Sequence, residues 1–436
     1  MAQGSDSAPS AGASRKGRFS RKVQTLQWLD RKLGVPVCFA LTIVRRLSDW
    51  FRRNPVETRP VRRILFLKLA EQGSTVLAHD AVRRAVERAG RDNVYFLVFE
   101  ENRFVVQLLG LIPEANIFAV RTHSAWAMIA SFVANLRSIR GHEIDACVDM
   151  EFFARGSAAL SYLSGARRRI GFHSYFGEGP YRGDLLTHRV LYNPHLHASA
   201  TFSSLVESLD TDPATLPALN FRAQPSAVPS IFQPSVEERA AVRELLDGLG
   251  VPPHGRLILL NANAGDLLPL RRWAGENYAA LARRLLAEFA DAWVAFTGAP
   301  EEAASIADLA ESVGSTRSVC VAGRTSLREL LTVYELAEVL VTNDSGPAHF
   351  AALTSVDTVA LFGPETPLLF GALGPRSHPL WAAIACSPCV NALNNRQTAC
   401  RNNLCMQAIS VDEVFALVAR LYAARVRTPQ KGAAAS

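Results

Sequence analysis

The sequence predicts an α/β protein whose two parallel-sheet lobes face a cleft. At 436 residues the chain exceeds the length at which a single hydrophobic core stops growing, so we expect two domains. From residue 63 onward, short β-rich runs alternate with helical patterns, which is typical of parallel strands joined by crossover helices. Prolines interrupt this alternation between residues 213 and 234, and we place the connection between the domains there.

The first series of elements forms the predicted N-terminal lobe, residues 61–225. Its predicted strands are 64–69, 93–99, 116–120 and 144–149. Its predicted helices are 75–89, 104–111, 124–140 and 153–164.

The second series forms the predicted C-terminal lobe, residues 235–385, followed at 386–425 by a cysteine-containing tail and a terminal helix. Its predicted strands are 256–261, 293–297, 319–322, 339–342 and 358–362. Its predicted helices are 277–289, 301–313, 327–337 and 346–353. Open parallel sheets bind ligands at the carboxyl ends of their strands, so two such Rossmann-like lobes predict a two-lobe enzyme with its site in the cleft.

The basic charge of the chain belongs to an N-terminal arm, residues 1–60. Residues 1–63 hold 14 Lys and Arg against 4 Asp and Glu. The apolar run 33–44 has 12 residues, too few to span a bilayer, which takes roughly 20. Arg45 and Arg46 follow where a signal peptide would be cleaved.

Two interpretations of this arm remain. In the first, it docks as an amphipathic segment on the anionic inner face of the plasma membrane, which makes the protein cytoplasmic and peripheral. In the second, it packs on the body of the protein. We expect no nucleic-acid partner, because no recognised nucleic-acid-binding motif accompanies the charge.

The tail contains a cluster of cysteines within 20 residues: Cys386, Cys389, Cys400 and Cys405. In a reducing cytoplasm such clustering favours a metal over disulfides. Four thiolates would fill a tetrahedral zinc site, so its role would be structural rather than catalytic. Free thiols and facultative disulfides are the alternatives.

The sharpest chemical signal is segment 341–352, where a hydrophobic strand leads through a polar turn into a helix. Its candidate ligand-binding residues are Asp344, Ser345, Gly346, Pro347 and His349. Ser345 is placed to cap the helix, whose free N–H groups and dipole favour a diphosphate. Asp344 would accept hydrogen bonds from sugar hydroxyls, and His349 would donate to a phosphate oxygen. The alternative is an ordinary capped helix with a satisfied histidine.

This segment resembles the C-terminal signature of glycosyltransferase family 9, the heptosyltransferases. Further likeness lies in the Phe-Gly-Pro stretch at 361–367, the turn at 322–327, the loop at 296–298 and the basic triplet at 271–273. The resemblance implies the GT-B architecture, a nucleotide-diphosphate-sugar donor, and inversion without a metal or other cofactor. The donor-binding residues that we add on this basis are Asn263, Arg271, Thr297 and Gly298.

The chain departs from the family at the proposed base. The family's first strand-to-helix loop has a Gly-Asp pair whose carboxylate deprotonates the acceptor, and here the pair is Gly73-Ser74. A serine cannot act as that base, so we expect Glu71 to replace it, with Asp149 in reserve. The alternative is that Glu71 only caps the next helix and that the chain is a catalytically silent nucleotide-sugar-binding scaffold or sensor at the inner membrane.

The acceptor side of the cleft is predicted from Gly73, Ser74 and a basic cluster that contains Arg168 and Arg169. This cluster also resembles a family segment and would hold phosphates or acidic sugars, or else it is a solvated loop. The sequence thus predicts an inverting glycosyltransferase that moves a sugar such as a heptose to a lipopolysaccharide-type glycan or glycolipid acceptor.

Overall fold

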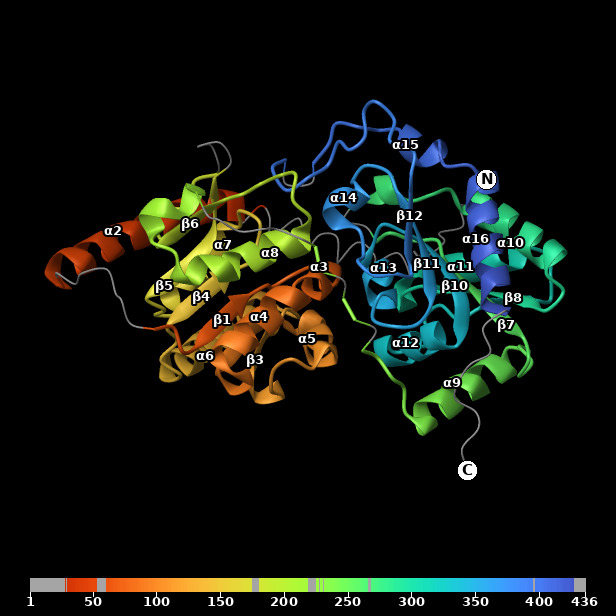
Figure 1. The fold of residues 1–436 in the computed structure, drawn as a ribbon, viewed down its shortest axis with the longest axis horizontal. Helices are drawn as coiled ribbons and strands as arrows, with labels where there is room; N and C mark the ends of the chain where they lie inside the picture. Colours follow the sequence, from red (N-terminus) through yellow and green to blue (C-terminus); the bar gives the residue numbers. More distant parts are fainter. Residues whose placement is uncertain are drawn as a thin grey trace, which may run out of the picture.

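The computed structural model describes residues 28, 30–52, 60–174, 180–218, 225–226, 228–229, 231–265, 268–394 and 397–426. The first 27 residues of the arm and part of the proline-rich connection lie outside this description. Figure 1 shows two lobes side by side, each built on a parallel sheet with helices against its faces. The predicted fold class is confirmed.

The N lobe contains a six-stranded parallel sheet with the order β3-β2-β1-β4-β5-β6. Its strands are β1 Ile64–Leu67, β2 Val94–Phe99, β3 Ile117–Val120, β4 Ala146–Asp149, β5 Arg168–Ser174 and β6 His188–Leu191. The central strands β1 and β4 are buried along their whole length, as expected of a parallel sheet covered on both faces.

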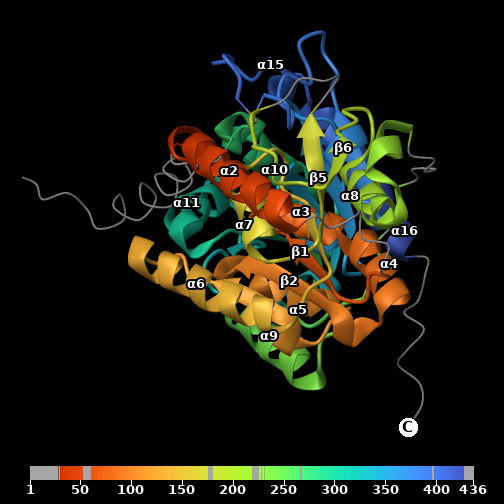
Figure 2. The same ribbon diagram turned by 90° about the vertical axis from the view of Figure 1, so that its left-hand side faces the viewer.

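Helices cover both faces of the N-lobe sheet. One face carries α3 Gln72–Leu77, α4 His79–Ala89, α5 Arg103–Leu109 and α8 Ala198–Glu207. The other carries α2 Gly34–Arg52, α6 Ala125–Gly141 and α7 Arg155–Leu163. Figure 2 shows α2 and α6 on the opposite side of the sheet from α4 and α8. The helix predicted at 75–89 is two helices, because the chain breaks at Ala78.

The C lobe also contains a six-stranded parallel sheet, with the strand order β12-β11-β10-β7-β8-β9. Its strands are β7 Arg256–Asn261, β8 Ala292–Phe296, β9 Ser318–Cys320, β10 Ala337–Asn343, β11 Asp357–Phe362 and β12 Ser377–Trp381. Its helices are α9 Val236–Gly248, α10 Gly275–Glu288, α11 Ala303–Ser312, α12 Leu327–Glu335, α13 Gly346–Ala351, α14 Pro367–Phe370, α15 Leu404–Gln407 and α16 Val411–Val426. The terminal helix α16 packs into the core of this lobe through Val414, Val418 and Tyr422.

The described part of the N-terminal arm is the helix α2, and one of its faces packs on the N lobe. Cys38 and Leu41 lie in a small core with residues of α7. Thr42 Oγ1 accepts a hydrogen bond of 2.8 Å from the backbone N–H of Asp184, whose carboxylate pairs with Arg45 at 2.9 Å. Helix α2 therefore packs on the body of the protein through one face, while its other face is exposed. Among the described residues, no helix combines the length and the apolar character needed to cross a bilayer.

Candidate functional site

The two lobes touch through the helices that follow the carboxyl ends of β1 and β10. Helix α3, which follows β1, contacts α13, which follows β10 (Figure 1). The closest approach is at Gly73, where an added Cβ would lie within 3.0 Å of the imidazole ring of His349. The glycine of the first loop and the histidine of the donor signature, far apart in sequence, thus lie against each other.

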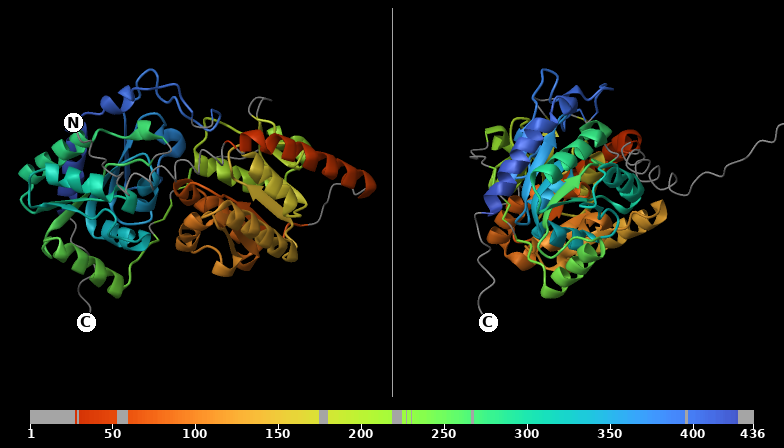
Figure 3. Two further views of the ribbon diagram at one scale, coloured as in Figure 1. Left: turned by 180° about the vertical axis from the view of Figure 1, so that it is seen from behind. Right: turned by 90° about the vertical axis from the view of Figure 1, so that its right-hand side faces the viewer.

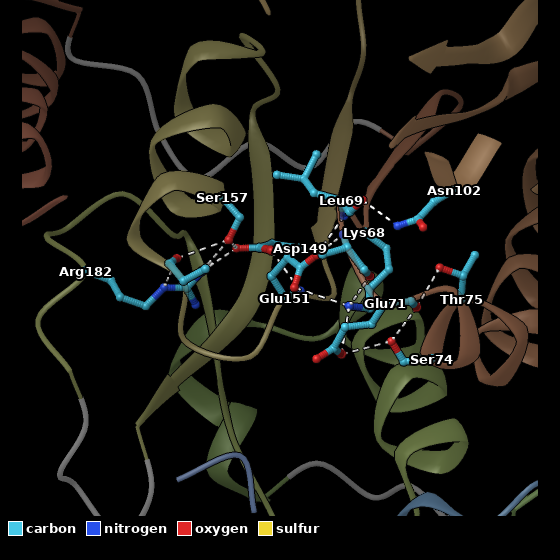
Figure 4. Close-up of polar contacts among 12 residues, drawn as sticks. Lys68, Leu69, Glu71, Ser74, Thr75, Asn102, Asp149, Glu151, Ser157 and Arg182 are labelled. Atoms are coloured by element: carbon cyan, nitrogen blue, oxygen red, sulfur yellow. Dashed lines mark hydrogen bonds and ion pairs between the residues drawn. The ribbon is translucent and has the colours of Figure 1, made fainter. Parts of the chain in front are cut away.

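A buried lysine organises the loop that contains Glu71. Lys68 Nζ donates to the carbonyl of Ala70 at 2.9 Å and lies 3.2 Å from Glu151 Oε2 and 3.5 Å from Glu71 Oε2. Glu151 Oε1 also accepts from the backbone N–H groups of Leu69 at 2.7 Å and Ala70 at 3.1 Å. Figure 4 shows these side chains converging on the loop. Charge-assisted hydrogen bonds from the Lys68 ammonium and to the Glu151 carboxylate therefore fix the backbone of this loop.

The carboxylate of Glu71 lies beside the residue that stands at the family's aspartate position. Ser74 Oγ donates to Glu71 Oε2 at 3.1 Å and to the Glu71 carbonyl at 3.0 Å. Glu71 has a φ of 67°, in the left-handed region that is rare for residues other than glycine. It occupies the N-cap position of α3, yet its side chain makes no cap hydrogen bond.

Asp149 is not available as a reserve base. Its carboxylate is fully buried, pairs with the buried guanidinium of Arg182, and accepts 2.8 Å and 3.1 Å hydrogen bonds from Ser157 Oγ and the Glu151 N–H (Figure 4). Burial raises its pKa, against the opposing effect of Arg182. Asp149 therefore stabilises the end of β4, and we withdraw it as a catalytic candidate.

Arg168 and Arg169 do not lie on the acceptor side. Both residues begin β5, so they lie at the amino edge of the sheet, opposite the carboxyl ends that face the junction. Arg169 is buried and donates to the carbonyls of Leu185 at 2.6 Å and Ala166 at 2.7 Å, and Arg168 donates to the carbonyl of Leu209. These contacts satisfy backbone acceptors and leave neither arginine facing the junction, which corrects the prediction.

On the donor side, Arg271 faces two carboxylates. Its Nη1 lies 3.3 Å from Glu365 Oε2 and 3.8 Å from Asp344 Oδ2, and both acidic residues are buried. Glu365 belongs to the Phe-Gly-Pro stretch, but its role was not predicted. The sequence signal that could have indicated this role is the position of Glu365, an acidic residue directly after the glycine and proline that follow a buried strand.

Within the described residues, two donors at this site are buried without an acceptor. Asn263 Nδ2 and Arg271 Nε have no hydrogen-bond partner within the part of the chain that the structure describes. A buried polar group without a partner costs about 1–3 kcal/mol, so such donors suit an acceptor-rich ligand such as a diphosphate. Ser345 is the N-cap of α13, but its side chain makes no cap bond and its Oγ donates to the carbonyl of Asn343 at 3.1 Å.

The remaining predicted donor residues shape the backbone around the site. Thr297 is buried and its Oγ1 accepts a 3.1 Å hydrogen bond from Asn261. Gly298 lies so close to neighbouring side chains that an added Cβ would meet three of them at 3.3 Å. Gly346 and Pro347 form the first turn of α13.

The cysteine tail supports the donor site from outside. Asn403, at the start of α15, donates to the carbonyls of Leu270 at 3.1 Å and Arg272 at 2.9 Å, which fixes the backbone on both sides of Arg271. Met406 fills the space beside Gly363, where an added Cβ would lie 2.8 Å from its Cγ. This packing contact joins α15 to the Phe-Gly-Pro loop.

The four tail cysteines are free thiols: Cys386, Cys389, Cys400 and Cys405. Cys405 is buried, and burial raises the pKa of its thiol. Within the described residues, no three His, Cys, Asp or Glu side chains are grouped so as to hold a metal. The structural zinc site remains a prediction.

Solved structures share this two-lobe architecture. The ADP-heptose lipopolysaccharide heptosyltransferase II of Escherichia coli superposes with a TM-score of 0.63 and 17% identity, covering 84% of this chain and 99% of that one. A glycosyltransferase family 9 protein of Veillonella parvula gives a TM-score of 0.63 and 19% identity, covering 83% and 97%. These likenesses establish the GT-B fold.

Sequence comparisons assign the family. Lipopolysaccharide heptosyltransferase 2 of Salmonella typhimurium is 35% identical over 101 residues, 23% of this chain. The corresponding lipooligosaccharide enzyme of Haemophilus influenzae is 34% identical over 103 residues. In both cases the matched segment spans only 29% of the relative's length. The family model of glycosyltransferase family 9 (heptosyltransferase), however, matches residues 133–399, more than half of the chain. The protein therefore belongs to glycosyltransferase family 9.

Proposed function

We propose that this protein is an inverting, metal-independent glycosyltransferase. In this proposal it moves a sugar, such as a heptose, from a nucleotide-diphosphate donor to a lipopolysaccharide-type glycan or other cell-envelope acceptor. The relatives named above are heptosyltransferases of lipopolysaccharide and lipooligosaccharide, which supports this acceptor class. The observation that carries the proposal is the contact of Gly73 with His349, because it brings a carboxylate-bearing loop to the donor signature.

Glu71 is the base in this mechanism. Its carboxylate takes the proton of the acceptor hydroxyl while the hydroxyl oxygen bonds to the anomeric carbon of the donor. The bond from that carbon to the diphosphate breaks on the opposite side, so the configuration inverts and the nucleoside diphosphate leaves. Lys68 and Ser74, which contact the Glu71 carboxylate at 3.5 Å and 3.1 Å, hold it in place.

The donor side stabilises the charge that develops on the leaving diphosphate. Arg271 supplies a permanent positive charge, and its Nε and the Nδ2 of Asn263 are the buried donors that an oxygen-rich ligand would satisfy. His349 is placed to add a further donor, and Asp344 to accept hydrogen bonds from the sugar. All four groups belong to loops or helices at the carboxyl edge of the C-lobe sheet, where such ligands bind.

We further propose that the protein acts at the cytoplasmic face of the inner membrane, held by α2. The exposed face of α2 is rich in large apolar side chains, including Val37, Phe39 and Val44. Basic residues of the arm would face anionic lipid headgroups, where each contributes on the order of 1 kcal/mol. A membrane-embedded glycolipid acceptor would then be held close to the enzyme.

A nucleotide panel and one substitution test the proposal. Calorimetry with nucleoside diphosphates and their sugar conjugates should give binding to at least one compound, and Asp344→Ala should weaken it. With that donor, Glu71→Gln should leave binding intact and reduce transfer by about a hundredfold or more, as loss of a general base does. Ser74→Asp in the Glu71→Gln background should restore part of the rate.

The scaffold alternative has one observation in its favour. Ser74 occupies the position of the family's carboxylate, and the neighbouring Glu71 is already engaged by Lys68. If the wild-type chain binds a nucleotide sugar but transfers it to no glycan or glycolipid acceptor, and Ser74→Asp creates transfer, the scaffold is correct. If no compound of the panel binds, the donor site itself is wrong.

A further inference from the structure

Exposed apolar side chains gather on a second helix of the N lobe besides α2. On α6, Trp126, Ile129 and Val133 are 78%, 51% and 41% exposed. Their spacing of three and four residues places them on one face of the helix. No acidic residue occurs in α6, and its last turns carry Arg137 and Arg140. Single exposed apolar residues are ordinary, but a contiguous apolar helix face with a basic end indicates a docking surface.

This face and that of α2 belong to one layer of helices. Met128 and Phe132 of α6 and Leu160 of α7 pack against the same core of the N-lobe sheet. On its other side α7 packs against α2, where Ala158 contacts the core that contains Cys38. Figures 2 and 3 show α2 and α6 on the same side of the N lobe in views from opposite ends. The two exposed faces therefore flank α7 and point away from the same face of the sheet.

The chemistry of this layer matches a lipid surface better than a second protein copy. Trp28 and Trp50 on the α2 side are 57% and 73% exposed, like Trp126 on α6. Tryptophan is enriched at the level of lipid headgroups, where its ring is apolar and its N–H is hydrated. The accompanying charge is basic, so anionic lipids complement it, whereas a symmetric dimer would place arginines against arginines.

We propose that α6 is a second membrane-docking helix, which together with α2 seats this layer of the N lobe on an anionic bilayer. The inference rests on the proposed docking of α2 and adds an orientation to it. One helix permits the lobe to roll about the helix axis, whereas two helices on either side of α7 define a plane.

Both helices start at the carboxyl edge of the N-lobe sheet, the edge that carries the Glu71 loop. Thr122, just before α6, donates a hydrogen bond to the carboxylate of Glu101. The backbone carbonyl of Glu101 in turn accepts a 2.6 Å hydrogen bond from the side chain of Gln72, next to Glu71. Asp30, before α2, accepts 2.8 Å from the backbone N–H of Gly156 at the start of α7. A glycolipid anchored in the bilayer would therefore reach the Glu71 loop from between the two helix starts.

Vesicle binding tests this inference with three variants of the full chain. The vesicles contain phosphatidylethanolamine and phosphatidylglycerol, and sedimentation gives the lipid concentration for half-maximal binding. Serine at Trp126, Ile129 and Val133 should raise this concentration about tenfold, because apolar burial drives such docking. Serine at Val236 and Leu404, exposed apolar residues of the C lobe, is the matched control and should change nothing.

The third variant, with serine at Ile43, Val44 and Leu47 of α2, separates the possible failures. If the α2 variant loses binding while the α6 variant behaves as the control, the role of α6 is refuted and the docking of α2 stands. If the wild-type chain does not bind these vesicles, both docking proposals fall, and nucleotide binding still tests the transferase proposal.

Tryptophan quenching gives a second readout that a folding defect would not imitate. Brominated lipids should quench part of the fluorescence, and Trp126→Phe should remove a share of that quenching without changing the circular dichroism spectrum. Unchanged quenching in Trp126→Phe would contradict insertion of α6. If sedimentation velocity shows a dimer that the α6 variant dissociates, the surface binds a second copy instead, and the proposal is wrong.

Discussion

Replacing Gly73 with alanine should separate the two halves of the site without altering any functional group. The added Cβ would lie within 3.0 Å of one ring atom of His349 and 3.2 Å from two others. Ordinary van der Waals contact begins at about 3.4 Å, so either the imidazole or the whole α3 segment must move. Gly73 has no left-handed φ, so the effect is steric rather than conformational.

The cost follows from the packing of both partners. His349 is buried, and α3 is fixed by the Lys68 and Glu151 network, so neither side yields easily. Overpacking of this kind costs about 1–3 kcal/mol, which lowers the equilibrium constant for contact between the lobes by about 5- to 150-fold. The rate of sugar transfer should fall by up to that factor, while donor affinity falls less, since most of the donor residues lie in the C lobe.

The assay compares transfer rate, donor affinity by calorimetry and thermal unfolding for Gly73→Ala and for Gly141→Ala. An added Cβ on Gly141, at the end of α6 in the same lobe, meets no heavy atom within 4 Å and should have no effect on transfer. The double variant Gly73→Ala/His349→Ala should lose less than the sum of the single effects, because the second change removes the clash. Wild-type transfer by Gly73→Ala would refute the claim that this contact assembles the site.

Three further predictions concern the donor site and the N-lobe core. Asn403→Ala should weaken donor binding by about tenfold, because it removes the hydrogen bonds to two backbone carbonyls beside Arg271, which costs about 1–1.5 kcal/mol. Calorimetry measures the donor affinity, and Asn402→Ala is the control. Glu365→Gln should tighten binding of a free nucleoside diphosphate about three- to tenfold, since it removes a buried negative charge 3.3 Å from Arg271, and weaker binding would contradict this. Burial lowers the pKa of His188 to about 4, so the folded state disfavours its protonation. The free energy of unfolding should therefore fall by up to about 3 kcal/mol as pH drops from about 6.5 to 4. Urea titrations of His188→Gln should show a smaller fall, and an identical pH dependence would refute the assignment.

The fold was predictable because the central strands are continuous apolar runs separated by helical patterns. The sequence Ile-Leu-Phe-Leu of β1 can only be buried on both faces, which requires a parallel sheet covered by helices. Three strands, β5, β6 and β12, are missing from the predicted set, and β6 and β12 are edge strands. β6 alternates buried and exposed residues, and β12 contains Pro379 and is only partly buried. Edge strands need only one partner, so their sequences lack the apolar signal of the centre.

Site residues were harder to predict, because their roles depend on partners that are distant in sequence. Asp149 does end a strand at the carboxyl edge, but Arg182, 33 residues later, neutralises it. Arg169 has the charge expected of an acceptor site, yet it lies at the start of β5, at the edge of the sheet opposite the junction between the lobes. Lys68 and Glu365 were not predicted, because a buried ion pair has no local pattern.

The geometry of Glu71 favours a catalytic role over the helix cap that the sequence also allowed. The left-handed backbone of Glu71 costs about 1–3 kcal/mol. If Glu71 were a helix cap, hydrogen bonds from the first N–H groups of α3 to its side chain would offset that cost. The Glu71 side chain makes no such bond. Its carboxylate instead contacts the ammonium of a buried lysine and the hydroxyl of Ser74, one helical turn further on. The Glu71 carboxylate lies within hydrogen-bond distance of the side chain at position 74, so in the proposed mechanism it supplies the acid from three residues before the family's position, in the loop whose Gly73 contacts His349.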